Sequence, residues 1–227
     1  MIQLHSFLVV NCSHPDPENS PVAARLLTFI ALLACLALLS GCAVLPGSQP
    51  ARIDKYVLEY NPVESSPRSE SELPVMIITV PRAHGGYDTS RIAYREQQFG
   101  LRYYSKSRWA DTPARMLAPL LAEAMTDTGV FRALSVSPGS LAARYRLDSE
   151  LIHFYQDFTV QPSEVRIMLR AQLVSLADNQ VLASRLFDVR EAASSEDAYG
   201  GVQAANRASG RLLDELAQFC KNHTDDR

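Results

Sequence analysis

The sequence predicts an α/β fold: a single domain with a mixed β-sheet that ends in an antiparallel meander and is flanked by helices. Residues 144–190 alternate apolar and polar side chains, as half-buried strands do. Residues 75–80 form a continuous apolar run, the pattern of a strand buried on both faces. Two further segments, starting near residues 112 and 195, repeat apolar residues every three or four positions, as amphipathic helices do.

The composition supports a globular protein and excludes several classes. The 227 residues are 47% hydrophobic and carry a net charge of -3, which excludes a chain that is disordered throughout. A pI near 6.0 provides no basic field for nucleic acid. A single long apolar segment is too little for a polytopic membrane protein.

That apolar segment indicates a signal peptide, residues 1–41. Leu26 to Leu39 contains one polar residue, Thr28. As a helix it would be about 21 Å long, shorter than the roughly 30 Å of a membrane span. Arg25 precedes it, as a basic residue precedes a signal-peptide core. The alternative, a buried helix of the fold, is disfavoured because the run has no polar face.

The first 21 residues do not resemble a signal-peptide start. Residues 1–21 contain no Lys or Arg, and they include the acids Asp16 and Glu18. We therefore expect translation to begin later, near Val22 or Leu26.

Leu39, Ser40, Gly41 and Cys42 resemble the lipobox of bacterial lipoproteins. A thiolate is a good nucleophile for lipid transfer, and the small residues before it fit a peptidase site. The resemblance implies that Cys42 becomes the first mature residue and carries covalent diacylglycerol and an N-acyl chain. The alternative is an unmodified, buried cysteine. Ala43 follows instead of Asp, which in the enterobacterial sorting rule implies the outer membrane.

Processing at this site would divide the chain into a tether at 42–52, a domain at 53–222 and a tail at 223–227. Cys12 and Cys35 would be removed, leaving Cys220 without a disulfide partner. We expect Cys220 to be buried near the end of a helix.

The first half of the domain is predicted to hold several strands. Tyr56–Tyr60 is rich in strand-forming residues, and a Pro- and Ser-rich loop follows at 61–74. The apolar run of 75–80 is the buried strand. Shorter strands are expected at 92–95 and 101–104.

A helix should follow, with Asp111 or Thr112 as its cap and Pro113 at its first position. Gly129 should end it, and Pro119 predicts a kink or a late start. The expected apolar face comprises Met116, Leu117, Leu120, Leu121 and Ala124.

The second half should begin with a short strand at 134–136 and continue as a three-stranded meander at 144–190, turning at Asp178 and Asn179. In its first strand we expect one apolar face to comprise Tyr145, Leu147, Leu151, His153 and Tyr155. The last helix should start near Ser195, with Ser194 and Asp197 as a capping box. Its expected buried face comprises Ala198, Val202, Ala205, Ser209, Leu212, Leu216 and Phe219.

This order of elements, together with the lipobox, resembles the ABC-type transport auxiliary lipoprotein family, which includes paraquat-inducible protein C. The resemblance covers residues 53–220. It implies an anticodon-binding-domain-like fold and partnership with an MCE-domain protein and its ABC permease and ATPase, which move lipids or other hydrophobic molecules between membranes. The segments that carry it are Ile77-Ile78-Thr79-Val80-Pro81, Ile92-Ala93-Tyr94-Arg95, Arg108-Trp109-Ala110-Asp111, Tyr145-Arg146-Leu147 and His153-Phe154.

Enzymatic activity is not expected, and neither is a metal or another cofactor. The sequence lacks a G-x-S-x-G nucleophile elbow. His84, His153 and His223 are too scattered to suggest catalysis or a metal site, and we expect His153 to pack on the sheet. Gly85-Gly86 lacks the Lys of a phosphate-binding loop.

Tyr94, Arg95 and Trp109 form a possible partner interface, because Tyr, Arg and Trp are enriched at binding hot spots. The alternative, which we favour for Trp109, is that it packs at the base of the first helix while Arg108 is solvated. For the whole protein we expect a docking component that fastens a transport bridge to the outer membrane. The alternative is a periplasmic carrier that encloses lipid in a cavity. The sequence leaves open whether the chain forms a homo-oligomer.

Overall fold

The computed structural model describes residues 21–39, 52–61, 73–135 and 142–224. The chain divides into two compact units, residues 1–50 and residues 51–227. In the first unit, helix α1 (Pro21–Leu39) contains the apolar run. None of the helices in the described ranges is long and apolar enough to cross a membrane. The lipobox from Ser40 to Cys42 lies outside these ranges.

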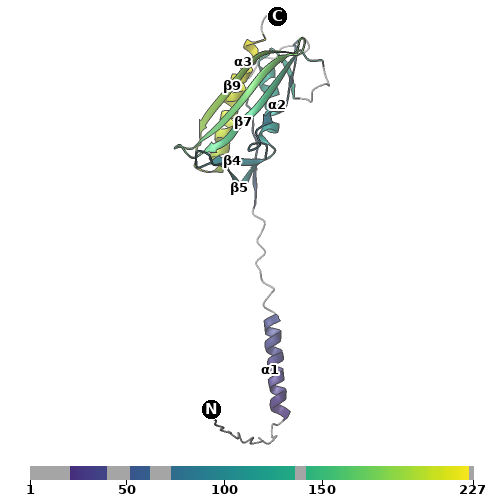
Figure 1. The fold of residues 1–227 in the computed structure, drawn as a ribbon, viewed down its shortest axis with the longest axis vertical. Helices are drawn as coiled ribbons and strands as arrows, with labels where there is room; N and C mark the ends of the chain where they lie inside the picture. The colour runs from purple at the N-terminus through teal and green to yellow at the C-terminus, as the bar shows by residue number, and fades with distance from the viewer. Residues whose placement is uncertain (1–20, 40–51, 62–72, 136–141, 225–227) are drawn as a thin grey trace, which may run out of the picture. The chain divides into compact units, whose positions relative to one another are not determined.

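The described part of the second unit is a nine-stranded mixed sheet with two helices, which confirms the predicted fold class. Figure 1 shows α3 running along one side of the long strands. The elements are β1 (Asp54–Tyr56), β2 (Val75–Ile78), β3 (Arg82–Ala83), β4 (Arg91–Arg95), β5 (Arg102–Trp109), α2 (Pro113–Asp127), β6 (Arg132–Ser135), β7 (Tyr145–Asp157), β8 (Glu164–Ser175), β9 (Gln180–Ala192) and α3 (Ala198–Asn222).

Strand β7 is the centre of the sheet. One of its edges pairs with antiparallel β8 along its whole length, and β8 pairs with β9, so the predicted meander is confirmed. The other edge is shared by β2, β3 and β4, which lie parallel to β7 one after another. Strands β6 and β5 then extend the sheet beyond β2 and β4, and β1 pairs with β5.

A β-bulge in β7 changes which side chains face the core. The pairing register with β8 shifts between Leu151 and His153. Leu151 and Phe154 belong to the main hydrophobic core, whereas His153 contacts Tyr87 outside it. The prediction that Leu151 and His153 share one face is therefore wrong, because an extra residue reverses the alternation.

The first strands are shifted from their predicted bounds. Strand β2 is buried on both faces as predicted, since Met76 and Ile78 lie in the core and Ile77 on the opposite face is 3% exposed. The predicted strand at 56–60 is wrong, because β1 ends at Tyr56. Beyond it, the Asn206 side chain bonds the Glu59 N–H and the Val57 carbonyl oxygen, so α3 replaces a strand as their partner.

Helix α2 matches its predicted signals. The Thr112 side chain accepts a hydrogen bond from the Arg115 N–H, and Pro113 occupies the first turn. Gly129 follows the end with a φ of 67°, a conformation that glycine adopts at little cost. The helix does not start late, since Pro119 lies exposed within one continuous helix.

Helix α3 begins three residues later than predicted. Asp197 is its N-cap and accepts a hydrogen bond from the Gly200 N–H at 2.8 Å. The predicted capping box is wrong, because the Ser194 hydroxyl bonds Gln203 instead of the helix backbone. The expected face is buried except for Ala198, and the helix packs against β8, β9 and α2.

One close contact fixes α3 against the end of β7. Gln156 is 2% exposed, accepts a hydrogen bond from the Tyr104 hydroxyl and donates one to Ser163 Oγ, both at 2.9 Å. A Cβ at Gly201 would lie 2.1 Å from Gln156 Oε1, so only glycine allows this approach. By contrast, a Cβ at Gly210 would meet nothing within 4 Å.

Gly201→Ala should therefore destabilise the protein by about 2–3 kcal/mol, since Gln156 must leave its buried hydrogen bonds. Gly210→Ala, in the same helix, should stabilise it by roughly 0.5–1 kcal/mol through helix propensity. Urea unfolding measures both changes. Equal effects of the two variants would contradict the contact with Gln156.

Candidate functional site

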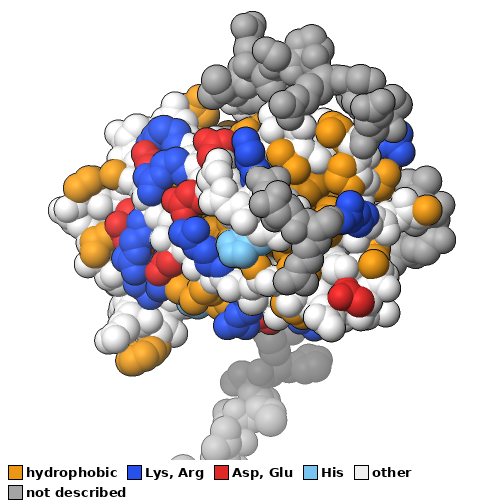
Figure 2. Space-filling view, turned by 90° about the horizontal axis from the view of Figure 1, so that it is seen from above, with side chains coloured by type: hydrophobic (Ala, Val, Ile, Leu, Met, Phe, Trp, Pro, Cys, Tyr) orange, Lys and Arg blue, Asp and Glu red, His pale blue; other side chains and the backbone are white. Residues whose placement is uncertain are grey.

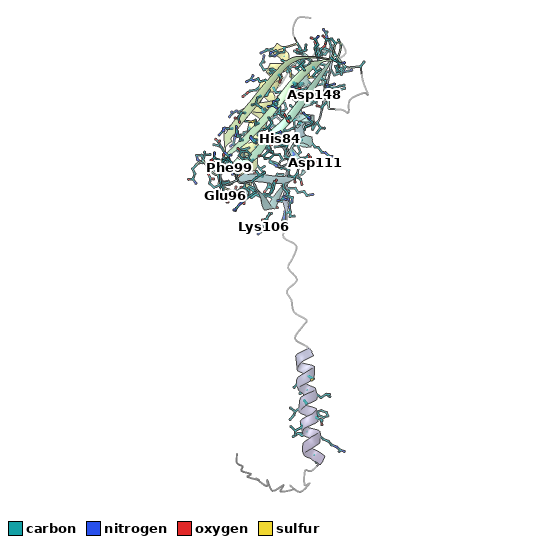
Figure 3. The ribbon with its side chains drawn as sticks, viewed as in Figure 1. His84, Glu96, Phe99, Lys106, Asp111 and Asp148 are labelled. Atoms are coloured by element: carbon teal, nitrogen blue, oxygen red, sulfur yellow. The ribbon has the colours of Figure 1, made fainter. Side chains whose placement is uncertain are left out.

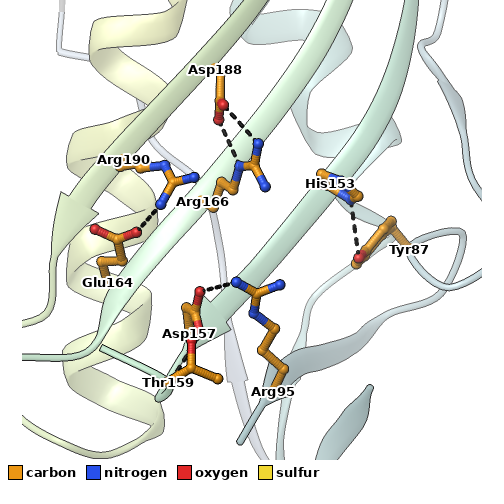
Figure 4. Close-up of polar contacts among 9 residues, drawn as sticks. All are labelled: Tyr87, Arg95, His153, Asp157, Thr159, Glu164, Arg166, Asp188 and Arg190. Carbon is orange, nitrogen blue, oxygen red and sulfur yellow. Dashed lines mark hydrogen bonds and ion pairs between the residues drawn. The ribbon is translucent and has the colours of Figure 1, made fainter. Parts of the chain in front are cut away.

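The face of the sheet turned away from the helices carries paired charges. On β8 the odd-numbered side chains from Val165 to Leu173 are buried and the even-numbered ones are at least partly exposed. Arg166 donates from Nε and Nη2 to the two carboxylate oxygens of Asp188 in β9, at 2.8 and 2.7 Å. Figure 4 also shows the neighbouring pair of Arg190 and Glu164, at 2.6 Å.

The pairing continues along the meander. Arg170 contacts Glu150 at 2.8 Å, and Arg146 contacts Asp148 at 2.9 Å. In Figure 2 basic and acidic side chains lie next to one another on the surface seen from above. Since exposed pairs contribute about 0–1 kcal/mol each, this face gains little stability from them. Balanced charges also make it a poor electrostatic target for a strongly charged ligand.

The most buried ion pair lies where β4 joins β7. Arg95 of β4 binds Asp157, whose side chain is 1% exposed. Thr159 donates to the same carboxylate from its backbone N–H at 3.0 Å and from its hydroxyl at 2.6 Å. Burial alone would raise the pKa of Asp157, but the hydrogen bonds from Arg95 and Thr159 outweigh burial and lower it. The carboxylate is therefore charged at neutral pH and joins the two strands.

A small aromatic cluster lies beside this ion pair. Tyr87 meets His153 edge to face and stacks on Tyr155, and its hydroxyl is 3.4 Å from His153 Nδ1. Burial raises the pKa of Tyr87 to about 12. Burial, followed by the charge of Arg166, lowers the pKa of His153. Both groups are thus neutral at neutral pH, and His153 packs on the sheet as predicted.

The three residues predicted for a partner interface do not form one surface. Trp109 is 3% exposed and packs on Phe154, with ring centroids 5.4 Å apart. It is therefore a core residue, so the packing alternative is correct and its place in an exposed interface is wrong. Tyr94 packs against Tyr104 at 4.7 Å. Only Arg95 belongs to the face that bears the paired charges.

The histidines show no catalytic arrangement within the described ranges. His84 Nε2 contacts Glu150 Oε1 at 3.2 Å, and His223 Nδ1 contacts the Phe219 carbonyl oxygen at 2.7 Å. In the same ranges no three His, Cys, Asp or Glu side chains converge as metal ligands. Cys220 is buried as predicted, and burial raises the pKa of its thiol to about 12, which makes it unreactive at neutral pH.

The apolar interior offers little room for cargo. A cavity between the sheet and α3, lined by residues that include Trp109, Phe154 and Ala205, has a volume of about 10 Å³. A cavity must offer at least that much to hold one water molecule. A hollow of about 400 Å³ lies at the other end of the meander, where Arg144, Ser175, Asn222 and other mainly polar residues line it.

Sequence reasoning missed the contact of Arg95 with Asp157. The spacing of Asp157 and Thr159 was the available signal, because Asp often accepts hydrogen bonds from the residue two positions on. Nothing in the local pattern could identify Arg95 as the partner, since 62 residues separate it from Asp157.

Asp157→Asn should destabilise the protein by about 2–4 kcal/mol at pH 7, because it leaves Arg95 without a counter-charge. A carboxyl whose pKa is lowered by folding stabilises the folded protein at pH values above its pKa in the unfolded chain, which is near 4. This contribution is lost as the pH falls through the lower pKa of the folded protein. The difference between the wild type and the variant should therefore shrink below about pH 4. Urea unfolding across this pH range measures it.

The matched control is Glu96→Gln, which removes an exposed pair with Arg102 at 3.0 Å. It should cost less than about 1 kcal/mol. An Asp157→Asn effect no larger than this, or one that does not change with pH, would contradict the structural role of the pair.

Comparison with solved structures supports the fold. Protein XCC0632 from Xanthomonas campestris is 24% identical, and the match covers 74% of this chain and 94% of that one with a TM-score of 0.65. A crystal structure of an uncharacterized protein matches at 12% identity over 74% of this chain and 99% of its own, with a TM-score of 0.60. These likenesses show a shared fold. No curated protein matches the sequence.

The family comparison covers most of the domain just described. Residues 56–217 match the family of the ABC-type transport auxiliary lipoprotein component. The matched range runs from the end of β1 into the last turns of α3, and so contains the whole of β7 and its partners. The chain therefore belongs to the ABC-type transport auxiliary lipoprotein family.

Proposed function

We propose that the protein is a lipid-anchored accessory component of an ABC transport system. In this proposal acylated Cys42 holds it on the periplasmic face of the outer membrane. The folded domain docks an MCE-type transport bridge that carries lipids or other hydrophobic molecules between the membranes. Membership of the auxiliary lipoprotein family is the observation that carries the proposal. The lipobox at 39–42 and Ala43 at the sorting position support the anchor and its location.

The interior of the domain favours docking over carrying. A carrier needs an apolar cavity of some hundreds of Å³, whereas the apolar cavity beside α3 has about 10 Å³. The hollow of about 400 Å³ has mainly polar walls and does not suit an acyl chain. In this proposal the domain acts by recognising proteins, and it makes or breaks no covalent bond.

Acylation gives the first test. Cys42→Ala should abolish incorporation of labelled palmitate and release the protein from the outer-membrane fraction. Cys220→Ala should keep both the label and the location, because Cys220 is buried in the domain. Palmitate labelling and membrane fractionation in a bacterial host measure the two effects. Labelled, membrane-bound Cys42→Ala protein would contradict the anchor.

Lipid extraction separates docking from carrying. Organic extraction of the purified full chain, followed by mass spectrometry, should yield no free lipid in stoichiometric amount beyond the covalent chains on Cys42. Cys42→Ala protein serves as the control for covalent lipid. One molecule of bound lipid per chain in that variant would overturn docking and establish the carrier alternative.

A further inference from the structure

The loop between β4 and β5 presents an unusually exposed aromatic side chain. Phe99 is 95% exposed, more than the other large apolar residues of the described ranges. The Gly100 N–H donates to the Gln97 carbonyl oxygen at 3.1 Å, which closes a turn with Phe99 as its third residue. Leu101, the next apolar residue, is 37% exposed. The tip of the hairpin therefore offers apolar surface to whatever lies in front of it.

The strands behind this tip carry a strong excess of positive charge. Residues 52–56 and 91–109 contain seven Lys and Arg against two acids, and one of the seven, Arg95, is paired with Asp157. Both acids already have a partner: Asp54 pairs with Arg52 and Glu96 with Arg102. This excess contrasts with the whole chain, which has a net charge of -3.

Three of these basic residues lie close together in β1 and β5. Lys55 of β1 is the pairing partner of Arg108 of β5, and Lys106 lies two positions before Arg108 in the same strand. No acidic side chain in the described ranges forms an ion pair with any of the three. Adjacent like charges destabilise a sheet, so an anionic ligand would relieve repulsion as well as bind.

The chain enters the domain from the side of the hairpin tip. Since β1 is parallel to β5, Arg52 and Ile53 lie toward the start of β5, where the hairpin turns. Nine residues separate Arg52 from Cys42, a segment that reaches at most about 35 Å. Figure 3 shows Phe99, Glu96 and Lys106 together in the lower part of the domain, with Asp148 toward the other end.

We propose that the β4–β5 hairpin and β1 form a second, non-covalent contact with the anionic membrane that holds the lipid anchor. Phe99 enters the boundary between headgroups and acyl chains, and Lys55, Lys106 and Arg108 bind lipid phosphates. Phenylalanine and lysine are suited to this division, because one provides apolar area and the other attraction to anionic lipid. The inference rests on the proposed anchor at Cys42 and adds to it an orientation of the domain.

The test places a nitroxide spin label beside Phe99 in the full acylated chain, as Gln98→Cys. Cys220 is buried and does not compete for the label. The protein is reconstituted in vesicles of phosphatidylcholine with and without one quarter phosphatidylglycerol. The label should be more accessible to oxygen than to a water-soluble nickel complex, and more so in the anionic vesicles. The matched control is a label at Val181, the second residue of strand β9, which is 55% exposed and should remain in water.

Phe99→Ser and Lys106→Glu, each combined with the Gln98 label, should return that label to water. A basic residue near an anionic surface strengthens binding about fivefold, so the charge reversal should act more strongly than neutralisation by Lys106→Gln. A label at position 98 that stays in water on anionic vesicles would overturn the proposal. A label at position 181 that enters lipid to the same extent would also overturn it. The same holds if the label at position 98 is immobilised only when the ABC and MCE proteins are added.

The mass of the same sample reports acylation independently. An acylated chain with a water-exposed label would overturn the hairpin contact and leave the anchor intact. An unacylated chain would contradict the anchor.

Discussion

The domain depends on the need of one long strand to satisfy its backbone hydrogen bonds on both edges. Strand β7 spans Tyr145 to Asp157, and β8 occupies one edge completely. Among the strands of the described ranges none pairs with the whole of the second edge, and β2, β3 and β4 share it. Because buried N–H and C=O groups must be paired, this arrangement brings three separate segments of the first half of the chain onto the second half.

The shared edge explains where the specific polar contacts lie. Where β4 meets the end of β7, the sheet is held by Arg95 and Asp157 on one face and by Gln156 against Gly201 on the other. The bulge before His153 gives the two faces these different side chains. A polar residue is buried at each place only with its partners present, as the cost of an unpaired buried group requires.

The filled core and the proposed anchor are consistent with one model, in which the lipid provides attachment and the folded domain provides contacts with proteins. Lipid attachment would hold the domain at a membrane, and a sheet whose apolar cavity beside α3 has only about 10 Å³ would present surfaces to protein partners. In this view the balanced charges of the meander and the basic region formed by Lys55 of β1 with Lys106 and Arg108 of β5 serve different contacts. The meander is suited to a protein surface, where paired charges favour specificity, and the basic region is suited to anionic lipid.

The sequence alone determined the elements whose signals are local. The meander follows from its period of two, α2 from Thr112, Pro113 and Gly129, and the anchor prediction from the four residues of the lipobox. Only the tertiary structure decided what depends on distant residues. Strand β1 ends at Tyr56 because Asn206 of α3 forms a hydrogen bond with the backbone of Glu59 beyond it. Trp109 is buried by its packing in the folded domain. A bulge or a long-range ion pair leaves no periodic trace, since its energy arises between segments that meet only in the folded sheet.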